Sequence, residues 1–223
     1  YIATSTQEAS LDLKSMSESS TKVFILEVMG RHAGWIAAAG GLAKNEVTNA
    51  PHIILFPEIN FNQKRFLAEV KKSVVEDGYC VIVASEGIKN AKGKFLTESD
   101  TTDSFGHAQL GGVAPYLSNL VTKNLKLKTH WAVPDYLQRS ARHLSSKTDL
   151  LQAQAVGVKA VEFAVKGMNS VMPIIVRGKT KNYSWKIEAA PLSKIANVEK
   201  KLPRSFITKD GYGITKKAID CLL

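Results

Sequence analysis

The stretch that decides the fold spans residues 23–43 and reads VFILEVMGRHAGWIAAAGGLA. Its first six residues form a short apolar run rich in strand-forming side chains, and the run leads to Gly30, where the chain can turn tightly. Residues 33–43 are mostly small, which favours a helix packed closely against a sheet. The stretch therefore predicts a strand, a turn and a helix in succession.

The same alternation continues along the chain. The run YCVIVAS at 79–85 is short and almost wholly apolar, as in a strand that is buried on both faces of a parallel sheet. The expected strands are residues 23–28, 52–56, 79–85, 128–133, 171–176 and 183–190; the expected helices are residues 33–43, 62–77, 112–127, 147–166 and 215–222; and the polar, turn-rich residues 88–106 are expected to form an exposed loop. Strands that alternate with helices predict an α/β fold with a parallel sheet.

Composition narrows the class of protein. The 223 residues are 44% hydrophobic and 22% charged, which is enough apolar material for one globular domain or two small lobes with a shared core. Neither Cys80 nor Cys221 has a second Cys or His at the spacing of metal ligands, so we interpret both as buried or incidental thiols. No apolar run approaches the roughly 18 residues of a membrane span, and residues 1–20 lack the layout of a signal peptide. We expect a cytoplasmic protein that makes no contact with a membrane.

The net charge of +10 leaves two kinds of partner open. Basic residues bind nucleic acid when they are interleaved with aromatic side chains, but here they are dispersed along the chain. A positive field also attracts small anionic substrates such as phosphates. The charge alone does not decide between the two, and without a supporting motif we expect no nucleic-acid partner.

Polar residues follow three of the expected strands. Met29, Gly30 and Arg31 follow the first strand, Glu86 follows the third, and a cluster that ends in Arg139 follows the fourth. Ligands bind at the carboxyl ends of strands in parallel α/β sheets. Each of these residues alone is more commonly a solvated surface residue. Together, arginines that hold phosphate and a carboxylate that accepts from hydroxyl groups fit a phosphorylated sugar.

Residues 23–43 also closely resemble a segment of the phosphofructokinase family, whose Met-Gly-Arg segment contacts fructose 6-phosphate. The continuation HAGW at 32–35 is similar to the pyrophosphate-dependent members. The segments PEINF and VASEG then follow in the family's order, and Glu86 matches the acidic residue that binds the sugar. The resemblance implies a phosphofructokinase-like fold of three layers around a parallel sheet.

The family also has a Gly-His-x-Gln-Arg-Gly-Gly segment with a phosphate-binding arginine, for which this chain offers two candidates. GHAQLGG at 106–112 has Leu110 where the arginine is needed. YLQRSA at 136–141 has the arginine and is followed by the spacing of the family's next helix. We therefore assign Tyr136 and Arg139 to the substrate site and place GHAQLGG in an inserted segment of unassigned role.

The resemblance covers only the later part of the family's length. We expect residues 1–135 to be mainly the sugar-phosphate-binding lobe, with the inserted segment at about 88–130, and residues 136–223 to be the rest of the second lobe and the C-terminal elements. The family's donor-binding part and its Thr-Ile-Asp-Asn-Asp segment, which carries the general base and helps to hold magnesium, are expected upstream. We therefore assign no catalytic residue and no metal ligand to this chain, and expect it to be inactive by itself.

The resemblance implies an enzyme of glycolysis that transfers a phosphoryl group from pyrophosphate, with Mg²⁺, to fructose 6-phosphate and gives fructose 1,6-bisphosphate. It also implies a homodimer, because relatives share sugar sites across subunit contacts. Two alternatives stay open: an ATP-dependent 6-phosphofructokinase, and a non-catalytic subunit that binds sugar phosphate. The residues that separate pyrophosphate users from ATP users lie in the part of the family that this chain does not match.

Overall fold

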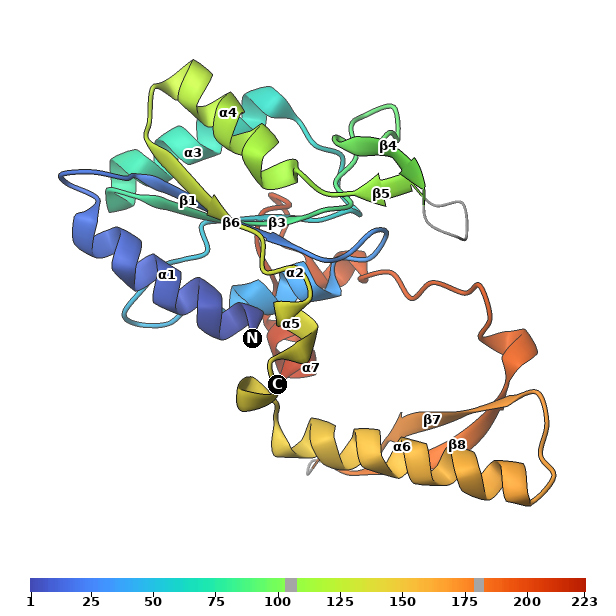
Figure 1. Cartoon of the computed structure of the whole chain (residues 1–223). Coiled ribbons are helices and arrows are strands. Elements are labelled where there is room, and N and C mark those ends of the chain that lie inside the picture. Colours follow the sequence, from blue (N-terminus) through green and yellow to red (C-terminus); the bar gives the residue numbers. More distant parts are fainter. Residues whose placement is uncertain (103–107, 179–182) are drawn as a thin grey trace. The chain divides into compact units, whose positions relative to one another are not determined.

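The contacts in the computed structural model divide the chain into two units (Figure 1). The first unit contains Tyr1–Ser140 and Lys200–Leu223, and the second contains Ala141–Glu199. The lobe boundary expected near residue 136 stays a prediction. The residues that the structure describes are 1–102, 108–178 and 183–223.

A four-stranded sheet forms the centre of the first unit. Its strands are, in spatial order, β2 (Ile53–Leu55), β3 (Cys80–Ser85), β1 (Val23–Val28) and β6 (Thr129–Ala132). All three pairings are parallel. This confirms the parallel sheet expected from the sequence, and it brings the carboxyl ends of β1, β3 and β6 to one edge.

Helices cover both faces of this sheet (Figure 1). Helices α3 (Gln63–Asp77) and α4 (Val113–Leu125) pack on one face, where a buried cluster includes Ile25, Phe66, Ile82 and Leu117. The other face is covered by α1 (Ile2–Met16), α2 (Trp35–Gly40) and α7 (Lys216–Leu222), and its cluster includes Leu26, Ala38, Val83 and Ala218. Residues of β1 alternate between the two clusters because successive strand side chains point to opposite faces. The result is the expected three-layer α/β fold.

The ends of α3 show how local sequence sets an element's length. The side chain of Asn62 accepts a hydrogen bond from the Arg65 N–H at 3.0 Å, which caps one of the free donors of the first turn. The helix ends at Gly78, whose φ of 84° lies in the left-handed region that favours glycine. Between these caps, Phe66 and Val70 recur at helical spacing and are buried against the sheet.

The region expected to be a loop after β3 contains part of a small second sheet. Strands β4 (Glu98–Thr102) and β5 (Ala108–Leu110) pair in antiparallel fashion, so the expectation of a loop throughout 88–106 is wrong for β4. Gly106 and His107 of the GHAQLGG segment lie outside the described residues. Short 3-10 turns are formed by Gly41–Ala43, Arg142–Leu144, Leu192–Lys194 and Arg204–Phe206.

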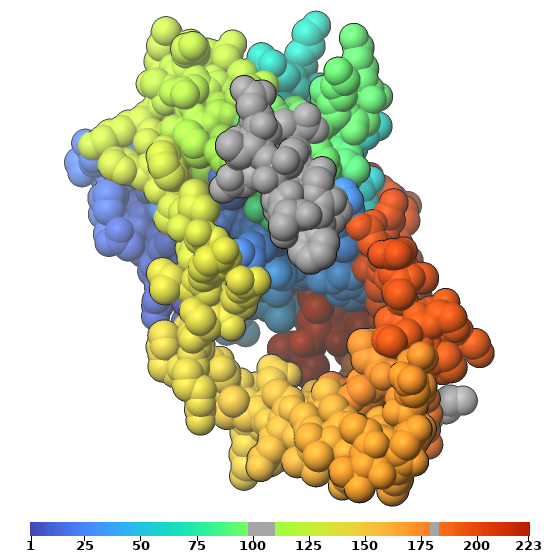
Figure 2. All heavy atoms as spheres, turned by 45° about the vertical axis from the view of Figure 1, so that its right-hand side comes forward, coloured from blue at the N-terminus to red at the C-terminus, as the bar shows by residue number. Residues whose placement is uncertain are grey.

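The second unit consists of a helix and a two-stranded antiparallel sheet. Helix α6 (Lys147–Val165) is followed by β7 (Val171–Arg177) and β8 (Trp185–Pro191), which are drawn from yellow to orange in Figure 2. The helix begins at Ser146, whose Oγ accepts a hydrogen bond from the Asp149 N–H at 3.0 Å. All three elements agree with the sequence-based expectation to within two residues. Over the described ranges, no helix in either unit combines the length and apolarity needed to cross a bilayer.

Candidate functional site

The turns that follow β1 and β3 are packed backbone against backbone. The Ser85 hydroxyl donates a hydrogen bond to the Gly30 carbonyl at 2.6 Å. A Cβ on Gly30, whose φ is 147°, would lie 2.8 Å from the Ala33 carbonyl oxygen, and a Cβ on Gly87 would lie 2.0 Å from that of Arg31. Only glycine permits such an approach. The two turns therefore have to adopt one joint conformation, which fixes the backbone that carries Arg31.

Glu86 hydrogen-bonds to the turn after β1. Its Oε1 accepts from the Gly30 N–H at 3.0 Å, and its own N–H donates to the Val28 carbonyl at 2.9 Å. The side chain is half-buried. A carboxylate can accept several hydrogen bonds, so after the bond to Gly30 it keeps capacity for a hydroxyl group of a ligand.

Aromatic and basic side chains lie beside this turn. The ring of His32 stacks on the ring of Phe95, with 5.8 Å between centroids, and the Lys89 ammonium lies 4.7 Å from the centre of the same ring. Arg31, next to His32, is half-buried. The strand ends therefore combine cationic groups with the carboxylate of Glu86, as binding of a phosphorylated polyol requires.

The turn after β6 lies next to the turn after β1. The one-turn helix α5 (Leu137–Ser140) contains Arg139, whose guanidinium carbon lies 4.4 Å above the ring centre of Tyr136. The Gln138 Oε1 accepts a hydrogen bond from the Met29 N–H at 3.1 Å. The structure thus joins Glu86 to Gly30 by a direct hydrogen bond, and it attaches the segment with Tyr136 and Arg139 to Met29 through Gln138.

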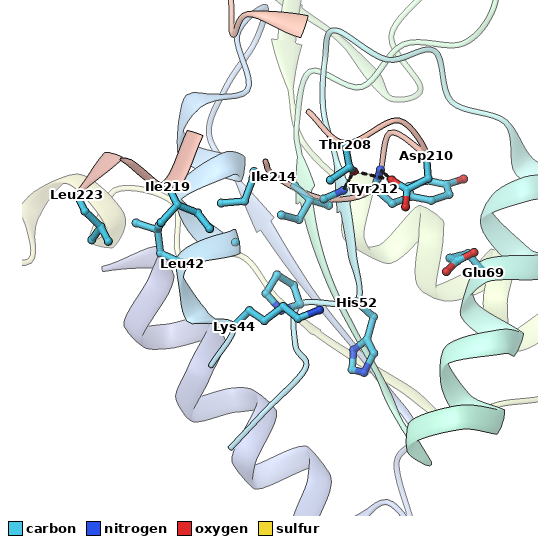
Figure 3. Close-up of a pocket in the computed structure, with 14 residues that line it drawn as sticks. Leu42, Lys44, His52, Glu69, Thr208, Asp210, Tyr212, Ile214, Ile219 and Leu223 are labelled. Atoms are coloured by element: carbon cyan, nitrogen blue, oxygen red, sulfur yellow. Dashed lines mark hydrogen bonds between the residues drawn. The ribbon is translucent and has the colours of Figure 1, made fainter. Parts of the chain in front are cut away.

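A separate cavity of about 410 Å³ lies beside β2, away from these strand ends (Figure 3). Its polar groups are largely engaged by the protein itself. The His52 Nδ1 accepts from the Val81 N–H at 3.0 Å, and the Asp210 Oδ1 accepts from the Tyr212 N–H at 2.9 Å. Burial lowers the pKa of His52, which favours its neutral form. The strand ends, where hydrogen bonds connect the turns that follow β1, β3 and β6, are therefore the better candidate site.

The phosphofructokinase family model matches residues 3–164. This chain belongs to the phosphofructokinase family. The pyrophosphate–fructose 6-phosphate 1-phosphotransferase of Xanthomonas campestris pv. campestris (strain B100) is 59% identical over 219 residues, which are 98% of this chain and 52% of that protein. The protein of the same name from Halomonas elongata is 58% identical over 217 residues, 97% of this chain and 52% of its own length.

Solved structures agree with the fold of this phosphofructokinase chain. The crystal structure of the pyrophosphate-dependent phosphofructokinase from Nitrosospira multiformis superposes with a TM-score of 0.86 at 55% identity and covers 100% of this chain and 52% of that one. The chain therefore spans about half the length of the relatives it matches.

Two carboxylates of this phosphofructokinase chain that accept hydrogen bonds from the backbone of distant segments were not expected from the sequence. Glu27 is only 2% exposed, and its Oε2 accepts a hydrogen bond from the Ala114 N–H at 2.8 Å, at the start of α4. The Glu58 Oε1 accepts from the N–H groups of Gly34 and Leu202, both at 2.9 Å. For Glu27 the sequence did carry a signal. Glu27 lies inside the apolar run VFILEV, and a carboxylate that is buried there needs hydrogen-bond donors from elsewhere in the fold. Local sequence carried no signal for the second.

The described residues contain no group of three or more His, Cys, Asp or Glu side chains that could hold a metal ion. The strand-end carboxylates of the phosphofructokinase chain are Asp135, which is exposed, and Glu86, one oxygen of which already accepts from Gly30. Mg²⁺ prefers an octahedron of oxygen ligands. This set does not fit a magnesium site.

Proposed function

We propose that this chain forms the sugar-phosphate-binding part of a pyrophosphate-dependent phosphofructokinase. The intact enzyme transfers a phosphoryl group from pyrophosphate to the 1-hydroxyl group of fructose 6-phosphate and gives fructose 1,6-bisphosphate. The observation that carries the proposal is the hydrogen bond between Glu86 and Gly30, which joins a carboxylate to the Met29–Arg31 turn at the strand ends. Relatives that are 56–59% identical over nearly the whole chain bear the name of this activity.

The proposed residues divide the substrate between them. Arg31 and Arg139 hold the 6-phosphate or orient the transferring group, because a guanidinium presents a planar set of donors that matches phosphate oxygens. Glu86 accepts a hydrogen bond from a sugar hydroxyl group. Met29 contacts the sugar, and Tyr136 adds a hydrogen bond from its own hydroxyl group.

Binding and orientation are the contribution we assign to this chain. Phosphoryl transfer needs little covalent help from the protein, so positioning of the two reactants and neutralisation of charge lower most of the barrier. We assign no general base to a described residue. Magnesium is the expected companion of pyrophosphate, but no residue of this chain is assigned to it, since the strand-end set does not fit. We further propose that the enzyme is a cytoplasmic homodimer.

Titration of the 223-residue chain with fructose 6-phosphate tests the sugar-phosphate site. We expect Arg139→Ala to weaken binding by a factor of about 10 or more, because a charge-assisted contact to phosphate is lost. Arg177→Ala is the matched control, since the guanidinium of Arg177 also lies over a tyrosine ring, 5.0 Å from the centre of Tyr183, in the second unit. Binding of fructose 6-phosphate that is no tighter than binding of fructose, or equal loss in both variants, would contradict the proposal.

Assay of the intact gene product decides the phosphoryl donor. Turnover of fructose 6-phosphate with magnesium and pyrophosphate, but not with ATP, is the expected result. Turnover with ATP alone would transfer the protein to the other donor class. Absence of turnover with either donor, together with retained binding of fructose 6-phosphate, would favour a non-catalytic subunit.

A further inference from the structure

The turn that contains Tyr136 and Arg139 projects into solvent. From Asp135 to Ser140 every residue except Gln138 is exposed, and Tyr136 and Leu137 are each 62% exposed. Gln138 is half-buried. Packing therefore does little to fix the position of this turn, and a polar contact has to supply the constraint.

The amide of Gln138 supplies it through both of its polar atoms. Its Oε1 accepts from the Met29 N–H at 3.1 Å, across 109 positions of sequence. Its Nε2 donates to the Asp135 carbonyl at 2.9 Å. One side chain thus bonds the end of β1 to the backbone of the turn, and only an amide of this length both accepts and donates in this way.

The backbone of the turn has a conformation that needs such support. Asp135 has a φ of 45°, in the left-handed region that residues other than glycine seldom adopt. Its carbonyl accepts from the Gln138 backbone N–H at 3.3 Å as well as from the Gln138 side chain. The second, shorter bond stabilises the unusual conformation that directs the following residues.

We propose that Gln138 is a positioning residue of the sugar-phosphate site, holding Tyr136 and Arg139 beside Met29–Arg31 at the carboxyl end of β1. This inference rests on the proposed function, because it assumes that the two segments bind one ligand. Without the amide, the exposed turn samples many positions, and binding has to order it again at the expense of affinity.

Two variants and one control test the role of Gln138. Gln138→Leu has a similar volume but no polar atom, whereas Gln138→Glu keeps the acceptor for Met29 and loses the donor to Asp135. Gln63→Leu is the control, since Gln63 is exposed at the start of α3. We expect the thermal unfolding midpoint of the folded chain to be the same for all three variants as for the wild type.

The first measurement, without ligand, is the exchange rate of the Met29 amide hydrogen by NMR. We expect exchange in Gln138→Leu to be about 10-fold faster than in the wild type, and Gln138→Glu to retain most of the protection, because its carboxylate can still accept this bond. Unchanged exchange in Gln138→Leu would overturn the inference.

The second measurement is titration with fructose 6-phosphate. We expect about 10-fold weaker binding by Gln138→Leu, an intermediate affinity for Gln138→Glu, and wild-type affinity for Gln63→Leu. Faster Met29 exchange with unchanged affinity would overturn the positioning role. If the wild-type chain itself does not bind fructose 6-phosphate, the proposed function fails, and Met29 exchange still decides whether the Gln138 contact exists.

Discussion

Both units of this chain form regular helices and strands, but they differ in how many of their residues are buried. In the first unit, Ile25, Phe66 and Ile82 are completely buried, because helices cover both faces of a four-stranded sheet. In the second unit, Gln152 is the only described residue that is buried, and Val161 in α6 remains 65% exposed. A helix on a two-stranded sheet forms only two layers, and such a small sheet is marginally stable in water. Local pattern is therefore enough for helices and strands, whereas the extent of the core depends on how many elements pack together.

Replacing one isoleucine by alanine in each unit should give the largest difference in stability between the two units. Ile82→Ala in β3 should lower the free energy of unfolding by about 2–5 kcal/mol, because it leaves a cavity between the sheet and its helices. Ile175 in β7 is 43% exposed, so Ile175→Ala should have an effect of less than about 1 kcal/mol. Urea unfolding followed by circular dichroism measures both values. Equal effects would mean that the second unit has a core as closed as that of the first.

Two glycines give a second matched pair. Gly87→Ala places a Cβ 2.0 Å from the Arg31 carbonyl oxygen and should destabilise the chain by about 1–3 kcal/mol while weakening fructose 6-phosphate binding. Gly157 lies within α6, where an added Cβ would meet no neighbouring atom within 4 Å, so Gly157→Ala should stabilise by about 0.5–1 kcal/mol. Thermal melting and ligand titration check both. A neutral Gly87→Ala would disprove the tight contact between the strand-end turns.

The contributions of two glutamates to stability should change with pH in opposite directions. Burial raises the pKa of Glu27 above its ordinary value of 4.5, and the nearby Glu86 carboxylate adds to the effect, although N–H groups at the start of α4 oppose it. The contribution of Glu27 to stability is therefore complete below pH 4.5, and it declines as the pH rises through the folded-state pKa. The hydrogen bond from Lys159 lowers the pKa of the half-buried Glu162. The contribution of Glu162 to stability is therefore lost as the pH falls through its folded-state pKa.

Urea unfolding of Glu27→Gln and Glu162→Gln across a pH series tests these signs. Relative to the wild type, Glu27→Gln should become less destabilising as the pH rises. Glu162→Gln should show a smaller trend of the opposite sign, because exposed ion pairs contribute little. A constant difference between wild type and Glu27→Gln would show that Glu27 titrates alike in the folded and unfolded chain.

Local sequence was sufficient for most elements and for part of the site. The runs at 23–28 and 79–85 predicted β1 and β3 almost to the residue, because buried parallel strands are short and continuously apolar. Their ends then identified Gly30, Arg31 and Glu86 as neighbours, since parallel strands present their carboxyl ends at one edge. The first helix, α1, had no comparable signal, because its buried face includes Thr6 and Ser10.

The contacts that complete the site were decided only by tertiary structure. Glu27 meets Ala114 across 87 positions of sequence, and Gln138 meets Met29 across 109. Neither pairing follows from periodicity, which describes one element at a time, because each depends on which strands become neighbours and in what register. The sequence by itself determined most of the elements and the residues at their ends. The packing of β6 beside β1 decided that Gln138 and Met29 meet, since only an assembled sheet brings those two strand ends within hydrogen-bonding distance.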